Sequence, residues 1–183
     1  MHGAVSQCGD CLLSAPPLDA CVAAVSYDYP WASLISQFKF HHQPGWARGL
    51  AGLLRSAPWV EPALEQTDLL IPMPLSAARL RERGFNQALE LARQLAPARK
   101  IEPRLLLRVK ETTPQLALSR SERLRNLRDA FAVEPLRAAR LRDTRVVLLD
   151  DVMTSGASLH AAALALRAAG VRHITGLVFA RTD

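Results

Sequence analysis

The chain is short of three features that mark whole groups of proteins. Its three cysteines among 183 residues are too few for the disulfide framework of a small secreted domain. Aromatic residues make up 5 %, and no apolar run approaches the ~20 residues that a membrane-spanning helix needs. The first residues lack the basic stretch and apolar core of a secretory signal. We therefore expect one globular, cytoplasmic unit without membrane insertion.

The scarce cysteines include one spaced pair. Cys8 and Cys11 form a Cys-x-x-Cys motif that can supply two ligands to Zn²⁺. A structural zinc site takes four ligands, so this site is incomplete by itself. The other candidate ligands near it in the sequence are His2, Cys21, His41 and His42. Cys21 lies in an apolar run and is predicted to be a buried strand residue. Free thiols at a frayed terminus, or half of a site whose first pair is missing because the chain begins late, are alternatives.

The most informative pattern spans residues 146–158 and reads Val-Val-Leu-Leu-Asp-Asp-Val-Met-Thr-Ser-Gly-Ala-Ser. Its four apolar residues predict a strand that is buried on both faces and ended by two acids. Thr154, Ser155 and Gly156 then predict a tight loop that enters a helix. Successive backbone N–H groups of such a loop, aligned with the positive end of a helix, bind phosphate. Ser158 can add a hydroxyl donor or act as the helix N-cap.

Two carboxylates, Asp150 and Asp151, stand directly before this loop. They repel a phosphate, so we expect them to face a neutral, hydroxylated group, and a ribose diol beside a 5′-phosphate fits. An apolar run that ends in two acids is also typical of the Walker B strand of nucleotide-hydrolysing proteins. Such proteins need a Gly-x-x-x-x-Gly-Lys-[Ser/Thr] loop, which this chain lacks.

Predicted strands alternate with predicted helices along the chain. Strands are expected over residues 22–27, 69–71, 105–109, 131–133, 146–149 and 173–180. Helices are expected over residues 31–40, 46–54, 119–128 and 159–169, with a long one ending at residue 96. This order predicts an α/β fold with a mostly parallel sheet flanked by helices. Pro58 and Pro62 predict a linker between a small N-terminal cap (residues 1–60) and the main domain (residues 61–183).

Three arginines, Arg79, Arg81 and Arg83, crowd the beginning of the helix expected after residues 69–71. Cations near a helix N-terminus oppose the helix dipole, which suggests a nearby anion. Asn86 is a good N-cap, so the helix can instead begin there and leave the arginines on a loop after a strand. Ligands of parallel α/β sheets are usually bound at that position. Arginines that simply solvate a loop are the alternative.

The positive charge is concentrated in one region. Residues 99–145 hold 13 Arg or Lys against 6 Asp or Glu, a net of +7 in a chain whose total is +6. Such a segment favours polyanions, either pyrophosphate or nucleic acid. Single-strand binding surfaces normally interleave aromatic and basic residues, and Phe131 is the one aromatic residue here. A solvated helix face is an equally good explanation.

Together these segments resemble the ComF/GntX family of competence-associated proteins, which have the type I phosphoribosyltransferase fold. The matching pieces are residues 29–40 ending in Phe-Lys-Phe, Ile-Pro-Met-Pro-Leu at 71–75, Arg-Glu-Arg-Gly-Phe-Asn-Gln at 81–87, residues 110–115 with 123–126, and the 146–158 pattern. They cover nearly the whole chain. Family members usually carry two Cys-x-x-Cys pairs that form a zinc finger, whereas this chain has one, which suggests a late-started N-terminus.

The resemblance implies a site for 5-phosphoribosyl 1-pyrophosphate (PRPP) with Mg²⁺. In such a site Asp150 and Asp151 take the ribose diol. The 5′-phosphate loop would consist of Val152, Met153, Thr154, Ser155, Gly156, Ala157 and Ser158. Residues 73–76, including Pro74, Leu75 and Ser76, would form the pyrophosphate loop, and residues 110–115 a flexible closing loop. Arg79, Arg83 and Lys110 would act in catalysis by neutralising the leaving pyrophosphate.

The resemblance also implies a role in DNA uptake or use, and it leaves the molecular function open. The chain departs from the family pattern at Ser155, where Thr is usual, and at Ala157, where Thr or Ser is common, but neither change removes a backbone donor. An active phosphoribosyltransferase, a single-stranded-DNA-binding module for DNA uptake, and a PRPP-sensing regulator are the three hypotheses. A homodimer is left open.

Overall fold

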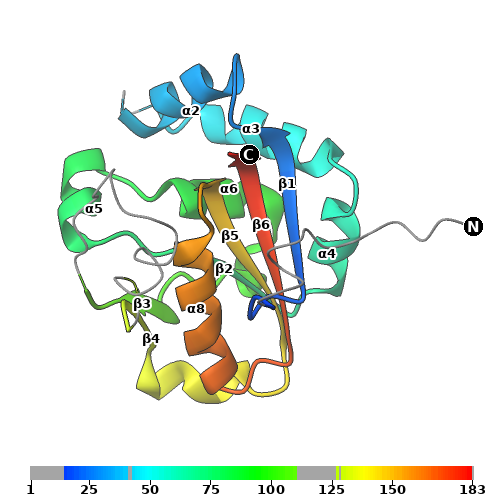
Figure 1. The fold of residues 1–183 in the computed structure, drawn as a ribbon, viewed down its shortest axis with the longest axis vertical. Helices are drawn as coiled ribbons and strands as arrows, with labels where there is room; N and C mark the ends of the chain where they lie inside the picture. Colours follow the sequence, from blue (N-terminus) through cyan, green and yellow to red (C-terminus); the bar gives the residue numbers. More distant parts are fainter. Residues whose placement is uncertain (1–14, 41–42, 111–126, 128, 183) are drawn as a thin grey trace, which may run out of the picture.

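A computed structural model describes residues 15–40, 43–110, 127 and 129–182. In these residues a parallel four-stranded sheet has the order β1-β6-β5-β2 (Figure 1). The strands are β1 (Ala20–Ser26), β2 (Leu69–Pro72), β5 (Arg145–Met153) and β6 (His173–Arg181). The predicted α/β class with a mostly parallel sheet is confirmed. Because the strands are parallel, all their carboxyl ends meet at one edge, the carboxyl edge, and their starts form the amino edge.

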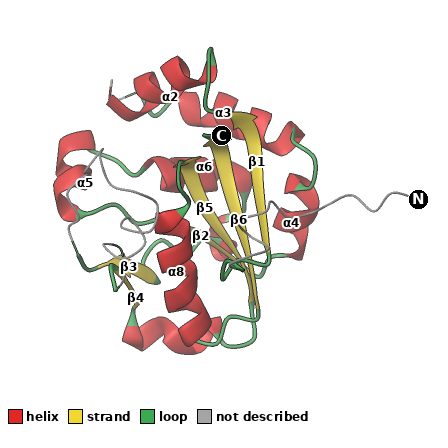
Figure 2. Ribbon diagram, viewed as in Figure 1, coloured by secondary structure: helices red, strands yellow, loops and turns green. Residues whose placement is uncertain are grey.

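Helices cover both faces of the sheet (Figure 2). Successive side chains of a strand alternate between faces, and β5 shows this directly. Val146 and Leu148 join a buried cluster with α8 (Ala157–Ala168). Val147 and Leu149 join a second cluster with α3 (Trp46–Ser56) and α6 (Gln87–Leu95). All four side chains are at most 1 % exposed, so β5 is fixed from both sides before it reaches the carboxyl edge.

Smaller elements surround the sheet. Helix α2 (Trp31–Phe40) has the bounds that the sequence predicts, and it lies beyond the carboxyl edge (Figure 1). The segment expected as a strand over residues 105–109 forms β3 (Leu106–Arg108), which pairs antiparallel with β4 (Phe131–Val133) outside the main sheet. In the described residues, two 3-10 helices, η1 (Ala98–Lys100) and η2 (Pro135–Leu141), also lie outside the main sheet.

The predicted linker at Pro58 and Pro62 is wrong, because residues Val60–Gln66 form helix α4. Pro62 is tolerated in the first turn, where a backbone N–H has no partner in any case. The predicted burial of Cys21 is also wrong. Strand β1 is at the edge of the sheet, which leaves Cys21 exposed. Strand β1 belongs to the predicted cap of residues 1–60, whose boundary stays a prediction.

The arginine-rich segment forms a helix of its own. Helix α5 (Ala77–Arg83) ends at Gly84, whose φ of 76° is the left-handed conformation that ends many helices. Asn86 then caps α6, its side chain accepting a hydrogen bond from the Leu89 N–H at 3.2 Å. The predicted start at Asn86 is confirmed, whereas the arginines lie on a short helix rather than on a loop. The helix expected over residues 119–128 falls almost wholly outside the described residues.

Candidate functional site

The loop between β5 and α8 presents backbone donors at the carboxyl edge. Gly156 has a φ of 73° and leads into α8 without a side-chain cap. Within the described residues, the N–H groups of Thr154, Ser155 and Gly156 make no hydrogen bond. The first N–H groups of α8 add the positive end of a helix dipole. The helix begins at Ala157, so Ser158 lies in its first turn and is not the N-cap that the sequence allowed.

The two acids lie inside β5, which continues through Met153, rather than ending the strand. Asp150 is paired with Val178 of β6, and the ladder resumes beyond Asp151 with the pair Val152–Ala180. The carboxyl groups of Asp150 and Asp151 nevertheless lie within electrostatic reach of each other, and the Asp151 N–H donates to Asp150 Oδ1 at 2.9 Å. Asp151 is 7 % exposed and lies on the face that α2 covers.

Lys39 of α2 reaches the acids from the predicted cap. Its Nζ lies 3.0 Å from Asp151 Oδ2, and both side chains are largely buried. The neighbouring Phe38 is fully buried and its ring contacts Phe85, with centroids 5.6 Å apart. The sequence interpretation quoted Phe-Lys-Phe as part of a motif but gave Lys39 no role. The one sequence signal for a role of Lys39 was its position between two aromatic residues, which could anchor the helix that carries it.

The electrostatics of the acids are unusual for a surface strand end. Burial, followed by the charge of Asp151, raises the pKa of Asp150 to about 7, although Lys39 opposes the shift. Asp151 Oδ2 is fully buried and makes no hydrogen bond within the described residues, so its partner there is the Lys39 ammonium. A buried polar atom of this kind is rare and calls for an explanation.

The predicted pyrophosphate loop and its arginines lie beside these acids. Ser76 caps α5 by accepting a hydrogen bond from the Arg79 N–H at 3.4 Å, and Pro74 and Leu75 are half-buried between β2 and that cap. Burial lowers the pKa of Arg83, and the Asp151 charge opposes this shift, which places Arg83 within electrostatic reach of the acid.

Arg83 is held from α6 as well. Its Nη1 donates to Gln87 Oε1 at 3.1 Å. Gln87 is 2 % exposed, and its Nε2 donates no hydrogen bond within the described residues. A buried amide with an unused donor beside the arginine adds to the unsatisfied polar groups on this side of the sheet.

Two predicted groups are not joined to the acids by any contact among the described residues. Lys110 is exposed at the end of β3, with its Nζ 3.9 Å from Asp129 Oδ2. The rest of the predicted closing loop, residues 111–115, lies outside the described residues. Cys8 and Cys11 lie outside them too. No cluster of three or more His, Cys, Asp or Glu residues fit for a metal ion occurs in the described part of the chain.

Known proteins of similar sequence place the chain in a family. Competence protein F of Haemophilus influenzae is 37 % identical over 173 residues, which cover 92 % of this chain and 75 % of that protein. DNA utilization protein YhgH of Salmonella typhimurium is 32 % identical over 157 residues, covering 83 % and 67 %. The chain belongs to the ComF family. YhgH of Escherichia coli (strain K12) is 30 % identical over 162 residues with the same coverage. No protein-family model matches the chain.

Helices of this ComF-family chain give no sign of a bilayer span. Across the described ranges, none combines the length and the apolar character that crossing a membrane requires.

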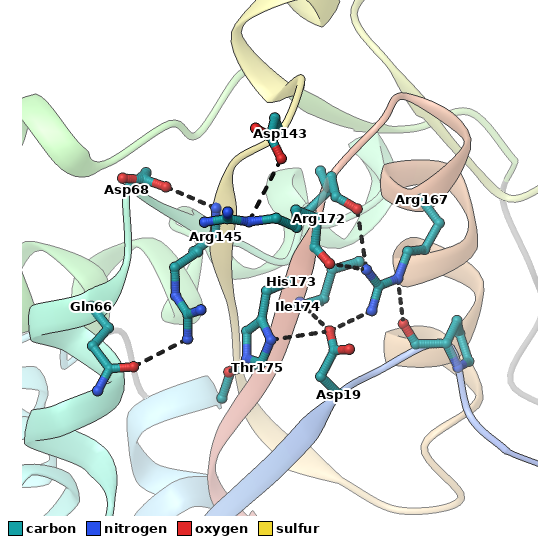
Figure 3. Close-up of polar contacts among 12 residues, drawn as sticks. Asp19, Gln66, Asp68, Asp143, Arg145, Arg167, Arg172, His173, Ile174 and Thr175 are labelled. Atoms are coloured by element: carbon teal, nitrogen blue, oxygen red, sulfur yellow. Dashed lines mark hydrogen bonds and ion pairs between the residues drawn. The ribbon is translucent and has the colours of Figure 1, made fainter.

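A hollow of this ComF-family chain lies at the amino edge, away from the acids. It has a volume of about 160 Å³ and is lined by residues that include Trp59, Gln66, Arg145, His173 and Thr175. Figure 3 shows that the polar groups around it largely bind one another. Arg145 Nη2 donates to Gln66 Oε1 at 3.1 Å, and His173 Nε2 lies 3.3 Å from Thr175 Oγ1. This edge therefore has the character of a structural network.

Proposed function

We propose that this protein binds PRPP, or a related sugar 5-phosphate, at the carboxyl edge of its sheet. The observation that carries the proposal is the juxtaposition of Asp150 and Asp151 with three consecutive loop amides that lack partners among the described residues. Unpaired amides at a helix start favour a phosphate, and carboxylates bind hydroxyl groups. One ligand that carries both groups is a ribose 5-phosphate.

The oxygen-rich donor set also fits Mg²⁺. Asp150, a carboxylate whose pKa is raised, stands next to Asp151, whose side chain keeps some exposure apart from the Oδ2 that Lys39 holds, and hard cations prefer carboxylate oxygens. If Mg²⁺ were bound with the ligand, Asp150 and the accessible part of Asp151 would hold it, and it would supply positive charge that offsets the pyrophosphate. In this proposal the acids orient the diol and thereby fix the anomeric carbon.

Transfer of the phosphoribosyl group is the further step of the proposal. Arg79 and Arg83 lie one helical turn apart on α5, close enough that the charge of Arg79 lowers the pKa of Arg83. This pair would neutralise the leaving pyrophosphate beside the loop of residues 73–76, and Lys110 would join it from the closing loop. Stabilising the leaving charge is the main task of such a site, because no protein nucleophile is needed.

Calorimetric titration with Mg-PRPP tests the binding proposal. We expect the wild-type protein to bind and Asp150→Asn to lose most of the affinity. Asp68→Asn, at the amino edge, is the matched control and should bind as the wild type does. Absence of wild-type binding at millimolar PRPP would end the proposal. Release of pyrophosphate with candidate amine or base acceptors then separates a transferase from a sensor.

For the cellular role, we propose participation in competence or DNA use, as the names of the relatives suggest. Binding of single-stranded DNA is the second candidate, and the +7 segment favours it. Phe131 does not offer a stacking surface there, since it is 5 % exposed and lies under Arg108, 5.6 Å from the ring centroid. Oligonucleotide binding at two salt concentrations tests this candidate, because an electrostatic site weakens steeply with salt.

A further inference from the structure

The carboxyl-edge acids receive a cation from a part of the chain remote in sequence. Lys39 lies in the last turn of α2, and its ammonium is 3.0 Å from Asp151 Oδ2. The side chains are 17 % and 10 % exposed, so the pair is shielded from water. Removing one partner of a shielded ion pair leaves an uncompensated charge, which makes the pair sensitive to substitution.

Helix α2 is fixed where it delivers this lysine. Phe38 is fully buried and contacts Phe85, which lies between α5 and α6. Ile35, one turn earlier, is 1 % exposed in the same cluster as Leu149 of β5. Because Phe38 and Ile35 pack in the core, the backbone that carries Lys39 is fixed within reach of Asp151.

The accessible part of Asp151 indicates what this arrangement does. Oδ2 is completely buried, so the exposure that the side chain retains lies elsewhere on it. With α2 docked, Lys39 is the partner of Oδ2, so a ligand that approaches from solvent meets the other, accessible part of the carboxylate. The ammonium instead orients the carboxylate and offsets one of two adjacent negative charges at a site meant for a polyanion.

We propose that Lys39 is a positioning residue of the carboxyl-edge site: by holding Oδ2 of Asp151 it turns the rest of that carboxylate toward a sugar hydroxyl. The inference rests on the proposed sugar-phosphate function and deepens it. It also makes α2 part of the site, so that the predicted N-terminal cap contributes a residue that acts on the acids.

Calorimetry with three ligands tests the role: ribose 5-phosphate, 2-deoxyribose 5-phosphate and inorganic phosphate. The ratio of the two sugar affinities reports the contact with the missing hydroxyl. We expect the wild type to favour ribose 5-phosphate by about tenfold, as a hydrogen bond to a charged group would give. Lys39→Met should bring the ratio close to one. Because it also removes a positive charge, any loss of affinity for inorganic phosphate should be shared by both sugar phosphates and cancel in the ratio.

Two further variants keep the test sharp. Lys39→Arg retains the charge and should restore most of the selectivity. Lys100→Met is the matched control, because the Lys100 ammonium donates to the Leu64 and Glu65 carbonyls, away from the acids. If Lys39→Met alone does not fold, Lys39→Met in the Asp151→Asn background removes both charges. It should have the same selectivity as Asp151→Asn alone, since Lys39 acts through Asp151.

The outcomes separate the two proposals. A wild-type protein that binds no ribose 5-phosphate at millimolar concentration overturns the proposed function and this inference with it. If the wild type is selective and Lys39→Met keeps that selectivity, the proposed role of Lys39 is wrong while the proposed function stands. The same holds if selectivity increases in Lys39→Met, as it would if the lysine were inhibitory.

Discussion

The amino and carboxyl edges of the same sheet use carboxylates in opposite ways. At the amino edge, Asp19 accepts a hydrogen bond from the Ile174 N–H at 2.7 Å and pairs with Arg167 (Figure 3). Burial alone would raise the pKa of Asp19, but these two partners outweigh it and hold the pKa below its usual value. At the carboxyl edge, burial and a like charge raise the pKa of Asp150 to about 7.

This difference separates a charge that stabilises the fold from a charge that the folded protein holds at a cost, as the proposed ligand site requires. Asp19 ties β1 to β6 and α8, and its charged form is favoured by folding. Asp150 is charged at a cost to the folded protein. Groups whose pKa is shifted by burial and a like charge gather at functional sites, where stability is exchanged for function.

The largest expected effect comes from Asp150→Asn. The substitution removes a charged acceptor from the proposed site, so PRPP affinity should fall about 10- to 100-fold in calorimetry. It also removes a like charge beside Asp151, so the melting temperature of the ligand-free protein should rise. A variant that binds normally, or that is less stable than the wild type, would erase the contrast between the edges.

Gly156→Val should have the next largest effect. A β-branched residue at φ 73° costs about 1–3 kcal/mol and would shift the loop amides, so PRPP affinity should fall by about tenfold. A Cβ at this position would lie 3.5 Å from the Met153 Sδ, an ordinary van der Waals distance, so crowding adds little to this cost. Gly156→Asn is the matched comparison, because Asn tolerates the left-handed region, and it should bind better than the valine variant.

Asp19→Asn should affect stability rather than ligand binding, the reverse of the result expected for Asp150→Asn. The unfolding free energy measured in urea should fall by about 1–2 kcal/mol, a value reduced by the partial exposure of the ion pair, while PRPP binding stays unchanged. Asp143→Asn is the control. Asp143 lies 3.6 Å from Arg172 in an exposed pair and should be worth less than about 0.5 kcal/mol. Loss of ligand binding in Asp19→Asn would show that the edges are coupled.

The remaining prediction is a pH dependence of stability. Between about pH 4 and pH 7 the folded protein keeps a proton on Asp150 that the unfolded chain has lost, so the stability contributed by Asp150 decreases as pH rises. Asp151, Lys39 and Arg83 surround the titrating group. Burial lowers the pKa of His173, so the stability contributed by His173 increases as pH rises, opposite to that of Asp150. His173 is present in both proteins, so the measured quantity is the wild-type melting temperature minus that of Asp150→Asn at each pH. A flat difference would refute the raised pKa.

Local sequence patterns were sufficient where one segment decides its own conformation. Residues 31–40 and 173–180 follow helical and strand periodicity, and Asn86 caps a helix as its side chain allows. The errors arose where a neighbour changes a local preference. Pro62 does not break α4 because it sits in the first turn, and β3 joins β4 rather than the main sheet.

By itself the sequence indicated the main strands and helices in order, though not α4 or the separate helix α5, and it indicated the strand, loop and helix that bring Asp150 and Asp151 beside the phosphate-type loop. These features depend on residues within one or two turns of each other. Only the tertiary structure decided that Lys39 meets Asp151 and that Asp19 meets Ile174. Such pairs depend on how α2 and β1 pack against β5 and β6, and the burial and charged partners that shift the pKa values of Asp150 and Asp19 exist only after that packing.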